Sequence, residues 1–544
     1  MRRSRAARAA WVAVALATLA GACSSGDPGG ERATRAAPGA PNVVVVYLDD
    51  LDVALLEDNL DVLPSIREHL VERGTRFTNA FVVDSVCCPS RATMLRGQYD
   101  HNHDVRGNAA PHGGFARFHE LGHEDSTVAT WLQDAGYATG LFGKYLNGYP
   151  DGVEPTYVPP GWDDWVSVIR GNGHRGFGYT LNVGGTLERH GDSPGDYLVD
   201  VLAGHASDFV TERAGDAPFF ALVSPYVPHL PAVGPPRYAD AHADAAAPRP
   251  PSFGEPDVSD KPAFVRNQAP LDDVTIAWLD SVYRRQLRTM RAADDLVGEV
   301  VAALERTGEL DETYLVLTSD NGFHRGQHRL RAGKLTAYDE DVRVPLVVRG
   351  PGVPAGGTAD EIVLNTDLAP TFADLARAPV PDFVDGRSFA PLLRGERPAT
   401  WREAFLVERY DDDVTAALGA GAAAAAGDDG EGTGPAGGGG PGGGGPGGGA
   451  PLPPPDGDAG PIPSTITVSL TPAYFALRTR DHLYVEWGNG DVELYDLRAD
   501  PYQLDNRAGT APPELLRAFA DRLAELKRCA GAGCRTAEDR PAPR

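Results

Sequence analysis

The segment PNVVVVYLDD, residues 41–50, is an unbroken run of mostly β-branched apolar residues that ends in two aspartates. A strand with one face in water alternates apolar and polar residues, and this run does not alternate. The pattern is typical of a strand buried on both faces, as in a parallel sheet covered by helices. The segment therefore predicts an α/β fold in which residues 49 and 50 follow a central strand.

The same strand pattern recurs along the chain, with helical segments between the strands. Residues 126–144, STVATWLQDAGYATGLFGK, have apolar residues at helical spacing and then a second apolar strand. Further strands are predicted from APFFALVSPYVPH, TYLVLTSDNG and RVPLVVRGPG, and a long amphipathic helix is predicted over about 276–307. This alternation predicts a large, mostly parallel sheet sandwiched by helices.

Polar residues directly follow four of the predicted strands. Because ligands in open α/β sheets bind outside the carboxyl ends of the strands, we expect these residues to gather at one edge of the sheet. They are Asp49, Asp50, Lys144, His229, Asp320 and Asn321.

The last part of the chain has a different pattern. Residues 474–506 alternate apolar and polar side chains and contain turn sequences at 480–481 and 488–490, which predicts an antiparallel sheet. A helix is predicted after it, over about 513–528. These elements are expected to form a second, smaller domain.

The domain organisation follows from these patterns. We expect a large domain over 41–400 and a C-terminal subdomain over 401–535. The subdomain is interrupted at about 416–463 by an Ala/Gly/Pro-rich insertion. This insertion is predicted to be disordered, because almost no side chain in it can offset the entropy lost on ordering.

The N-terminal segment has the pattern of a secretory signal. Four arginines precede an apolar run over 11–20 that is too short to span a bilayer, and small residues then lead to Cys23. Residues 1–23 are therefore predicted to be a signal peptide, and LAGAC, ending at Cys23, resembles the lipobox of bacterial lipoproteins. We expect a lipid anchor on the outer face of the bacterial cytoplasmic membrane, or otherwise secretion, with 24–40 as a flexible tether.

The formal net charge of −26 limits the partners of this chain. It argues against a nucleic-acid partner, because a phosphate backbone is bound by concentrated lysine and arginine. It also offers no long-range attraction to an anionic substrate. A site for an anion would need a local cluster of cations within an acidic surface.

Two of the five cysteines, Cys87 and Cys88, are adjacent in the stretch SVCCPSRATMLRG. A disulfide between neighbours is strained, so the pair is either two small buried apolar residues or the place of some chemistry. Cys529 and Cys534 could close a small loop in an oxidising compartment, and the sequence leaves that bond open.

Residues 87–91, CCPSR, match the pattern Cys-x-Pro-x-Arg when Cys87 is its first residue, and the surrounding chain resembles the type I sulfatases of the alkaline phosphatase superfamily. In that family a formylglycine-generating enzyme oxidises this cysteine to Cα-formylglycine. The resemblance implies that Cys87, not Cys88, is modified. One hydroxyl of the hydrated aldehyde then attacks sulfur, and loss of a proton from the other later expels sulfate.

The resemblance also implies a site for one Ca²⁺ per chain. Family members hold the ion with two aspartates after the first strand, a later Asp-Asn pair and the modified residue, which are oxygen donors suited to a hard cation. Each aspartate alone could equally cap a helix or a turn. The implied ligands are Asp49, Asp50, Cys87, Asp320 and Asn321.

Cationic side chains match positions that bind sulfate or transfer protons in the family. GLFGKYLN resembles the segment around the first sulfate-binding lysine, although many members have a histidine where this chain has Leu146. The implied catalytic residues are Cys87, Arg91, Lys144, His229 and Lys334, and the implied substrate-binding residues are Lys144, His229, Lys334 and His324. Four further residues either lie near the substrate or have a structural role: His101, Asn102, His103 and His328.

The motifs VCCPSRA, GKYLNGY and DHNH are most similar to N-acetylglucosamine-6-sulfatases and other glycan sulfatases. The resemblance implies hydrolysis of a sulfate ester on a sugar such as N-acetylglucosamine 6-sulfate. One alternative keeps the fold and changes the ester, giving an arylsulfatase or a formylglycine-dependent phosphonate or phosphodiester hydrolase. Another is a non-catalytic cell-surface relative that binds glycans, which the complete set of metal ligands disfavours.

Overall fold

The computed structural model describes residues 36–171, 173–411 and 471–543, which belong to one compact unit, Thr34–Arg544. The predicted signal peptide, Cys23, most of the predicted tether and the predicted insertion at 416–463 lie outside the described residues. In the described parts of the chain, none of the helices is both long and apolar enough to cross a membrane.

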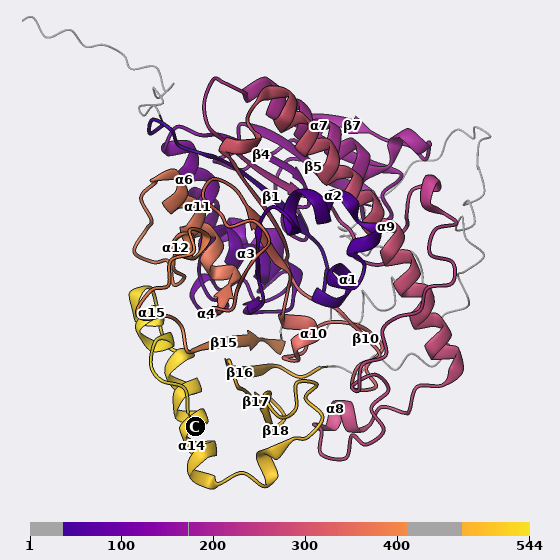
Figure 1. The fold of residues 1–544 in the computed structure, drawn as a ribbon, viewed down its shortest axis with the longest axis vertical. Coiled ribbons are helices and arrows are strands. Elements are labelled where there is room, and N and C mark those ends of the chain that lie inside the picture. Colours follow the sequence, from indigo (N-terminus) through magenta and orange to yellow (C-terminus); the bar gives the residue numbers. More distant parts are fainter. Residues whose placement is uncertain (1–35, 172, 412–470, 544) are drawn as a thin grey trace, which may run out of the picture. The chain divides into compact units, whose positions relative to one another are not determined.

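A ten-stranded sheet forms the centre of the unit (Figure 1). Its five central strands, β9, β1, β8, β4 and β5, are parallel to one another, and antiparallel neighbours flank them on both sides. The strands, in spatial order, are β13 (Gly357–Ala359), β2 (Thr75–Phe77), β12 (Leu346–Arg349), β9 (Thr313–Ser319), β1 (Asn42–Leu48), β8 (Phe219–Ser224), β4 (Ala138–Gly143), β5 (Asp164–Gly171), β6 (Tyr179–Val183) and β7 (Thr186–Arg189). The prediction of a large, mostly parallel sheet is confirmed.

The first strand of the chain is buried on both faces. Val43 and Val45 of β1 pack into one apolar core, whereas Val44 and Val46 pack into the core on the opposite face. This is the physical reason for the unbroken β-branched run, because both sets of side chains leave water. The two cores require helices on both faces of the sheet.

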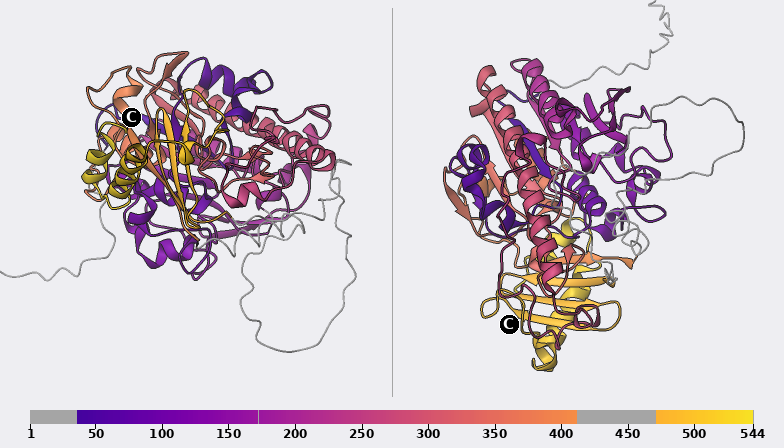
Figure 2. Two further views of the ribbon diagram at one scale, coloured as in Figure 1. Left: turned by 90° about the horizontal axis from the view of Figure 1, so that it is seen from below. Right: turned by 90° about the vertical axis from the view of Figure 1, so that its right-hand side faces the viewer.

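Helices cover each face. One core includes side chains of α3 (Cys87–Arg96), α6 (Val128–Asp134) and α11 (Leu368–Ala376), and the other includes side chains of α7 (Leu198–Arg213) and α9 (Asp273–Thr307). Figure 2 shows α7 and α9 side by side. The shorter elements are α1 (Val53–Glu57), α2 (Pro64–Ile66), α4 (Asp100–His103), α5 (Gly114–Glu120), α8 (Ala263–Arg266), α10 (Asp339–Val342), α12 (Ala390–Leu393), β3 (Ala80–Phe81), β14 (Val363–Leu364), β10 (His324–Arg325) and β11 (Ala332–Gly333).

A separate four-stranded antiparallel sheet lies in the C-terminal part of the chain, as predicted. It is formed by β15 (Ala404–Arg409), β16 (Tyr474–Thr479), β17 (His482–Trp487) and β18 (Val492–Asp496), and α14 (Pro513–Leu526) packs on it. The sequence predicted only the last three strands. The first, β15, precedes residues 412–470 in the chain and pairs with β16 after them.

Cys529 and Cys534 form a disulfide, which the sequence had left open. The loop between them contacts α4: the carbonyl oxygen of Cys529 accepts hydrogen bonds from His101 Nε2 and Asn102 Nδ2, both at 3.0 Å. His101 Nδ1 also contacts Glu408 Oε1 at 2.8 Å. His101 and Asn102 therefore hold the C-terminal loop against α4, which is the structural alternative of the two that the sequence allowed.

A buried ionic network connects the last helix, α15 (Ala532–Glu538), to residues just before α11 and α4. Arg402 forms ion pairs with Asp367 at 2.6 Å and with Glu538 at 2.8 Å, and all three side chains are fully buried. Tyr99 also donates to Glu538, at 2.6 Å. A buried carboxylate without a cation is costly, so Arg402 makes the burial of Asp367 possible and shares that role for Glu538 with Arg387, 2.9 Å away.

A variant without Arg402 should therefore unfold at a lower denaturant concentration than the wild-type protein. We expect Arg402→Met to lower the free energy of unfolding by about 3–5 kcal/mol, because it removes the cation paired with the buried Asp367 and one of the two cations paired with the buried Glu538, the other being Arg387 at 2.9 Å. The matched control is Arg480→Met, which removes the ion pair between Arg480 and Asp360. These two side chains are 50% and 58% exposed, so the substitution should lower the free energy of unfolding by less than about 1 kcal/mol. Equal urea midpoints for the two variants would contradict this account.

Candidate active site

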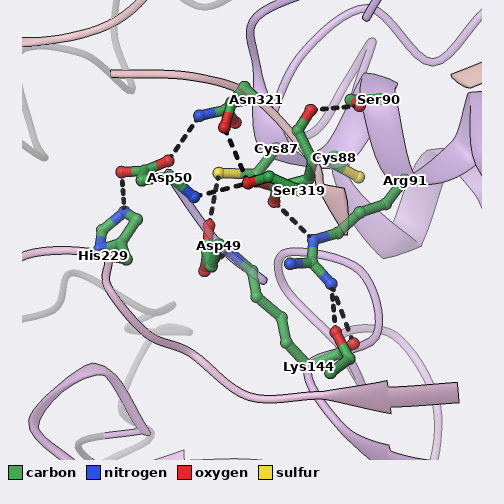
Figure 3. Close-up of polar contacts among 12 residues, drawn as sticks. Asp49, Asp50, Cys87, Cys88, Ser90, Arg91, Lys144, His229, Ser319 and Asn321 are labelled. Atoms are coloured by element: carbon green, nitrogen blue, oxygen red, sulfur yellow. Dashed lines mark hydrogen bonds and ion pairs between the residues drawn. The ribbon is translucent and has the colours of Figure 1, made fainter. Parts of the chain in front are cut away.

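The polar residues that follow the central strands meet at one edge of the sheet. Because β1 pairs in parallel with both β8 and β9, the residues after these three strands emerge side by side. Asp49 and Asp50 follow β1, Asp320 and Asn321 follow β9, and His229 lies in the loop after β8. Figure 3 shows these loops converging on the first turn of α3.

Asp50 connects the loop after β1 to the loop after β9. Its backbone N–H donates to Asp320 Oδ1 at 3.2 Å, and its Oδ1 atom accepts from Asn321 Nδ2 at 2.7 Å. Asp50 has a φ of 67°, in the left-handed region that aspartate tolerates better than most residues. Both contacts tie the residue after β1 to the pair after β9.

The two adjacent cysteines have different surroundings. The Cys87 Sγ atom lies 3.5 Å from Asp49 Oδ1, and the residue is 1% exposed, whereas Cys88 packs into the apolar core on one face of the sheet. Cys87 is also the first residue of α3, so it lies at the positive end of the helix dipole. Only Cys87 therefore faces the acidic residues.

Each of the three buried carboxylates is paired with one cation. Lys144 Nζ lies 2.7 Å from Asp49 Oδ2, and Arg91 Nε lies 2.8 Å from Asp320 Oδ2. The third pair is Lys334 with Asp50. Lys334 Nζ also lies 2.7 Å from Cys87 Sγ and 3.2 Å from Asn321 Oδ1.

These pairs set the charge states at the site. Burial by itself would raise the pKa of Asp49, but the positive charges of Lys144 and its neighbours hold that pKa well below its usual range. Burial opposes the charge on Lys334, but Asp50 and the neighbouring Asp320 and Asp49, together with Cys87, outweigh burial in sum and raise the pKa of the lysine well above its usual value. Burial raises the pKa of the Cys87 thiol to about 12 despite the nearby lysines. The unmodified thiol is therefore neutral and a weak nucleophile at neutral pH.

His229 is the most exposed of these groups, at 27% of its side-chain surface. Its Nδ1–H donates to the Leu230 carbonyl at 2.5 Å, and its Nε2 lies 3.7 Å from Asp50 Oδ2. The first contact fixes the ring and leaves Nε2 to exchange a proton.

His324 lies next to the lysine loop. It begins β10 and pairs with Gly333 of β11, the residue before Lys334. Its Nδ1 contacts Asp341 Oδ1 at 2.8 Å. His328 contacts Glu255 at 2.7 Å through Nδ1 and is buried, so it supports the loop. Leu146, in the place of the family's second histidine, packs in the apolar core.

Three residues of the site were missed from the sequence. Ser224, the last residue of β8, accepts from Arg91 at 2.8 Å, and Asn108 accepts from the backbone N–H of Cys88 at 2.9 Å. The His174 ring lies 4.3 Å from the His229 ring. The polar end of the strand ALVS could have indicated Ser224, but Asn108 and His174 come from loops without a periodic pattern.

The donor set fits a hard divalent cation. Ligand atoms of Asp49, Asp50, Cys87 and His229 lie within 4.8 Å of one another, and Asp320 and Asn321 add further oxygens. Carboxylate and amide oxygens are the ligands that Ca²⁺ prefers. The ammonium group of Lys334 contacts Asp50, Asn321 and Cys87, so a positive charge among these residues is compatible with their arrangement.

Known proteins share this sequence and fold. Residues 41–378 match the protein family described as Sulfatase. N-acetylglucosamine-6-sulfatase of Capra hircus is 34% identical over 508 residues, covering 91% of this chain and 85% of the goat protein. An arylsulfatase of Volvox carteri is 36% identical over 369 residues, covering 62% of this chain and 56% of the algal protein.

A solved structure has the same fold. It is a protein in complex with its substrate D-glucosamine-2-N,6-O-disulfate, and it superimposes with a TM-score of 0.69 at 21% identity, covering 92% of this chain and 99% of that protein. The family match spans most of the chain, and the goat relative aligns with nine tenths of it. This chain therefore belongs to the sulfatase family.

Proposed function

We propose that this protein hydrolyses sulfate esters of sugars, with N-acetylglucosamine 6-sulfate or a related glucosamine sulfate as substrate. The observation that carries the proposal is the buried edge around Cys87, where three carboxylates are each paired with a cation. The goat relative is named for this substrate, and the solved neighbour binds a 6-O-sulfated glucosamine. Membership of the sulfatase family supports the reaction class.

The nucleophile in this proposal is residue 87 after oxidation of Cys87 to formylglycine by a formylglycine-generating enzyme. The hydrated aldehyde supplies a hydroxyl nucleophile that the neutral thiol cannot match. Its position at the first turn of α3 favours negative charge there. Lys334 Nζ, 2.7 Å from the side chain of this residue, would stabilise an oxyanion at the same place.

Asp49, Asp50, Asp320, Asn321 and residue 87 would hold one Ca²⁺. When bound, the ion supplies positive charge for the sulfate oxygens. Arg91 keeps Asp320 in place through its Nε, and its Nη1 donates to the Lys144 carbonyl at 3.1 Å and to Ser224. Arg91 therefore holds both Asp320 and the backbone of the segment that carries Lys144.

Lys144, Lys334 and His229 are proposed to contact the substrate. Lys144 is buried and Lys334 is mostly buried, with 13% of its side chain exposed, so in this low-dielectric site they would bind sulfate oxygens strongly and offset the charge that develops during S–O cleavage. His229 exposes its ring, and its Nε2 would donate a proton to the departing alcohol. His324, beside the lysine loop, is proposed to contact the sugar.

An arylsulfatase activity is a second candidate, favoured by the Volvox carteri relative. Hydrolysis of phosphonates or phosphodiesters with the same nucleophile is a further alternative. Comparing the hydrolysis rates of matched aryl sulfate and aryl phosphate esters would distinguish it from sulfatase activity. A non-catalytic glycan-binding role does not account for a complete set of buried acid–cation pairs.

We also propose the domain boundary at residue 400 and lipid attachment at Cys23. The disulfide between Cys529 and Cys534 is compatible with export to an oxidising compartment.

The two cysteines provide a matched test of the nucleophile. In protein made with a formylglycine-generating enzyme, Cys87→Ser should abolish hydrolysis of N-acetylglucosamine 6-sulfate. Cys88→Ser should retain at least about a third of the rate, because Cys88 packs in the core and its loss costs mainly apolar contacts. Mass spectrometry should find the aldehyde at residue 87 in wild type and Cys88→Ser. Full activity of Cys87→Ser would overturn the assignment.

Removing the metal should inactivate and destabilise the protein. We expect a chelator to remove activity and Ca²⁺ to restore it, with a rise in thermal midpoint equivalent to about 2.7 kcal/mol at a hundred times the dissociation constant. Asp320→Asn should lose this thermal response, because it removes a carboxylate from the donor set. Asp360→Asn, at an exposed ion pair, is the control and should keep it. A chelator-insensitive wild type would count against a metal site.

The role of His229 predicts a dependence on the leaving group. We expect His229→Ala to lower kcat for the sugar sulfate by about 100-fold or more, since an alcohol leaves poorly without a proton. Hydrolysis of 4-nitrophenyl sulfate should fall much less, because nitrophenolate leaves without protonation. His205→Ala, on α7, should change neither rate. Equal losses on both substrates would show that His229 has another role.

A further inference from the structure

The first turn of α3 lacks a cap from its own sequence. The first N–H groups of a helix have no partner within the helix and are usually capped by a preceding polar side chain. Here the preceding residue is Val86, which has no polar side chain. Pro89 has no N–H, and the N–H of Ser90 already donates to the Val86 carbonyl at 3.1 Å. The N–H of Cys88 therefore needs an acceptor from elsewhere.

Asn108 supplies that acceptor. Its Oδ1 atom accepts from the backbone N–H of Cys88 at 2.9 Å, from a loop twenty residues further along the chain. This N–H belongs to the peptide unit that joins residues 87 and 88. Because a peptide unit is planar, holding its N–H restricts the ψ angle of residue 87 and so the direction of the Cα–Cβ bond from which its side chain extends.

The loop that carries Asn108 is itself held in one shape. The N–H of Gly114 donates to the Gly107 carbonyl at 2.8 Å, and that of Arg106 donates to the His112 carbonyl at 2.7 Å. A Cβ atom at Gly113 would lie 2.0 Å from the Gly107 carbonyl oxygen, so the backbone fits only with glycine there. These contacts fix the backbone on both sides of Asn108.

The same loop also contacts the segment that carries Lys144. The N–H of Phe115 donates to the Asn147 carbonyl at 2.7 Å, and Asn147 is the last residue of the GKYLN motif. A Cβ atom at Gly114 would lie 2.9 Å from the Asn108 carbonyl oxygen and 3.2 Å from that of Asn147. Backbone contacts thus run from the lysine segment through residues 107–115 to the start of α3.

We propose that Asn108 is a positioning residue for the nucleophile, because it caps α3 through the peptide unit of residue 87. This proposal rests on the proposed function. Asn108 sets the geometry of residue 87 relative to Asp49 and Lys334, and the glycine-fixed loop keeps that geometry in register with Lys144. Small displacements of a reacting group cost large factors in rate, so the effect of Asn108 lies in kcat.

The test compares two helix caps. Asn108→Ala should lower kcat for both the sugar sulfate and 4-nitrophenyl sulfate by about 10-fold to 100-fold, with KM within about twofold. Asn108→Asp keeps an acceptor for the same N–H and should retain kcat within about threefold. The control is Asp272→Ala, which removes the acceptor for Thr275 N–H, at 2.8 Å, at the start of α9. It should lower the thermal midpoint and leave kcat unchanged.

Rates are normalised to the aldehyde content at residue 87, measured by mass spectrometry. A wild-type protein that carries the aldehyde and turns over no sulfate ester would refute the proposed function. An active wild type with unchanged kcat in Asn108→Ala, or with equal losses in Asn108→Ala and Asn108→Asp, would refute the role of Asn108. Should Asn108→Ala not fold, the kcat of Asn108→Asp decides, and a loss beyond threefold overturns the proposal.

Discussion

The pairing of three buried carboxylates with three cations is the constraint on which the rest of the site depends. Asp49, Asp50 and Asp320 are almost completely shielded from water, and a buried charge without a partner is unstable. Their partners come from separate parts of the chain: α3, the end of β4 and the loop after β11. The pairs therefore fix where each of these segments must lie, and they make the edge of the sheet a single unit.

The central fold was predictable because its signal is local. The run around Val44 has no alternation, and the structure buries both of its faces, as the pattern indicated. The direction in which neighbouring strands pair was harder to predict from the sequence. The apolar strand β12 pairs antiparallel with β9, and β15 pairs with β16 across residues 412–470. Such choices depend on contacts distant in sequence, which no local period records.

The candidate site was predictable to the extent that polar residues follow strands. Asp49 and Asp320 were found in this way, and the Cys-x-Pro-x-Arg register selected Cys87. Asn108 was not found, because its contact is with a backbone N–H and places no requirement on the partner's side chain. The DHNH motif illustrates the reverse: His101 resembles a substrate-side residue but contacts Glu408 and the Cys529 carbonyl.

The charge balance also explains how an acidic protein can bind an anionic substrate. The three carboxylates and the three cations of the pairs cancel formally, so these residues alone have little net attraction for sulfate. A divalent cation held by the same oxygens would leave two positive charges in excess. The lysines would then be free to turn from Asp49 and Asp50 toward sulfate oxygens. In the proposed enzyme the three carboxylates therefore do not oppose the binding of an anionic substrate, because they would hold the divalent cation whose positive charge attracts it.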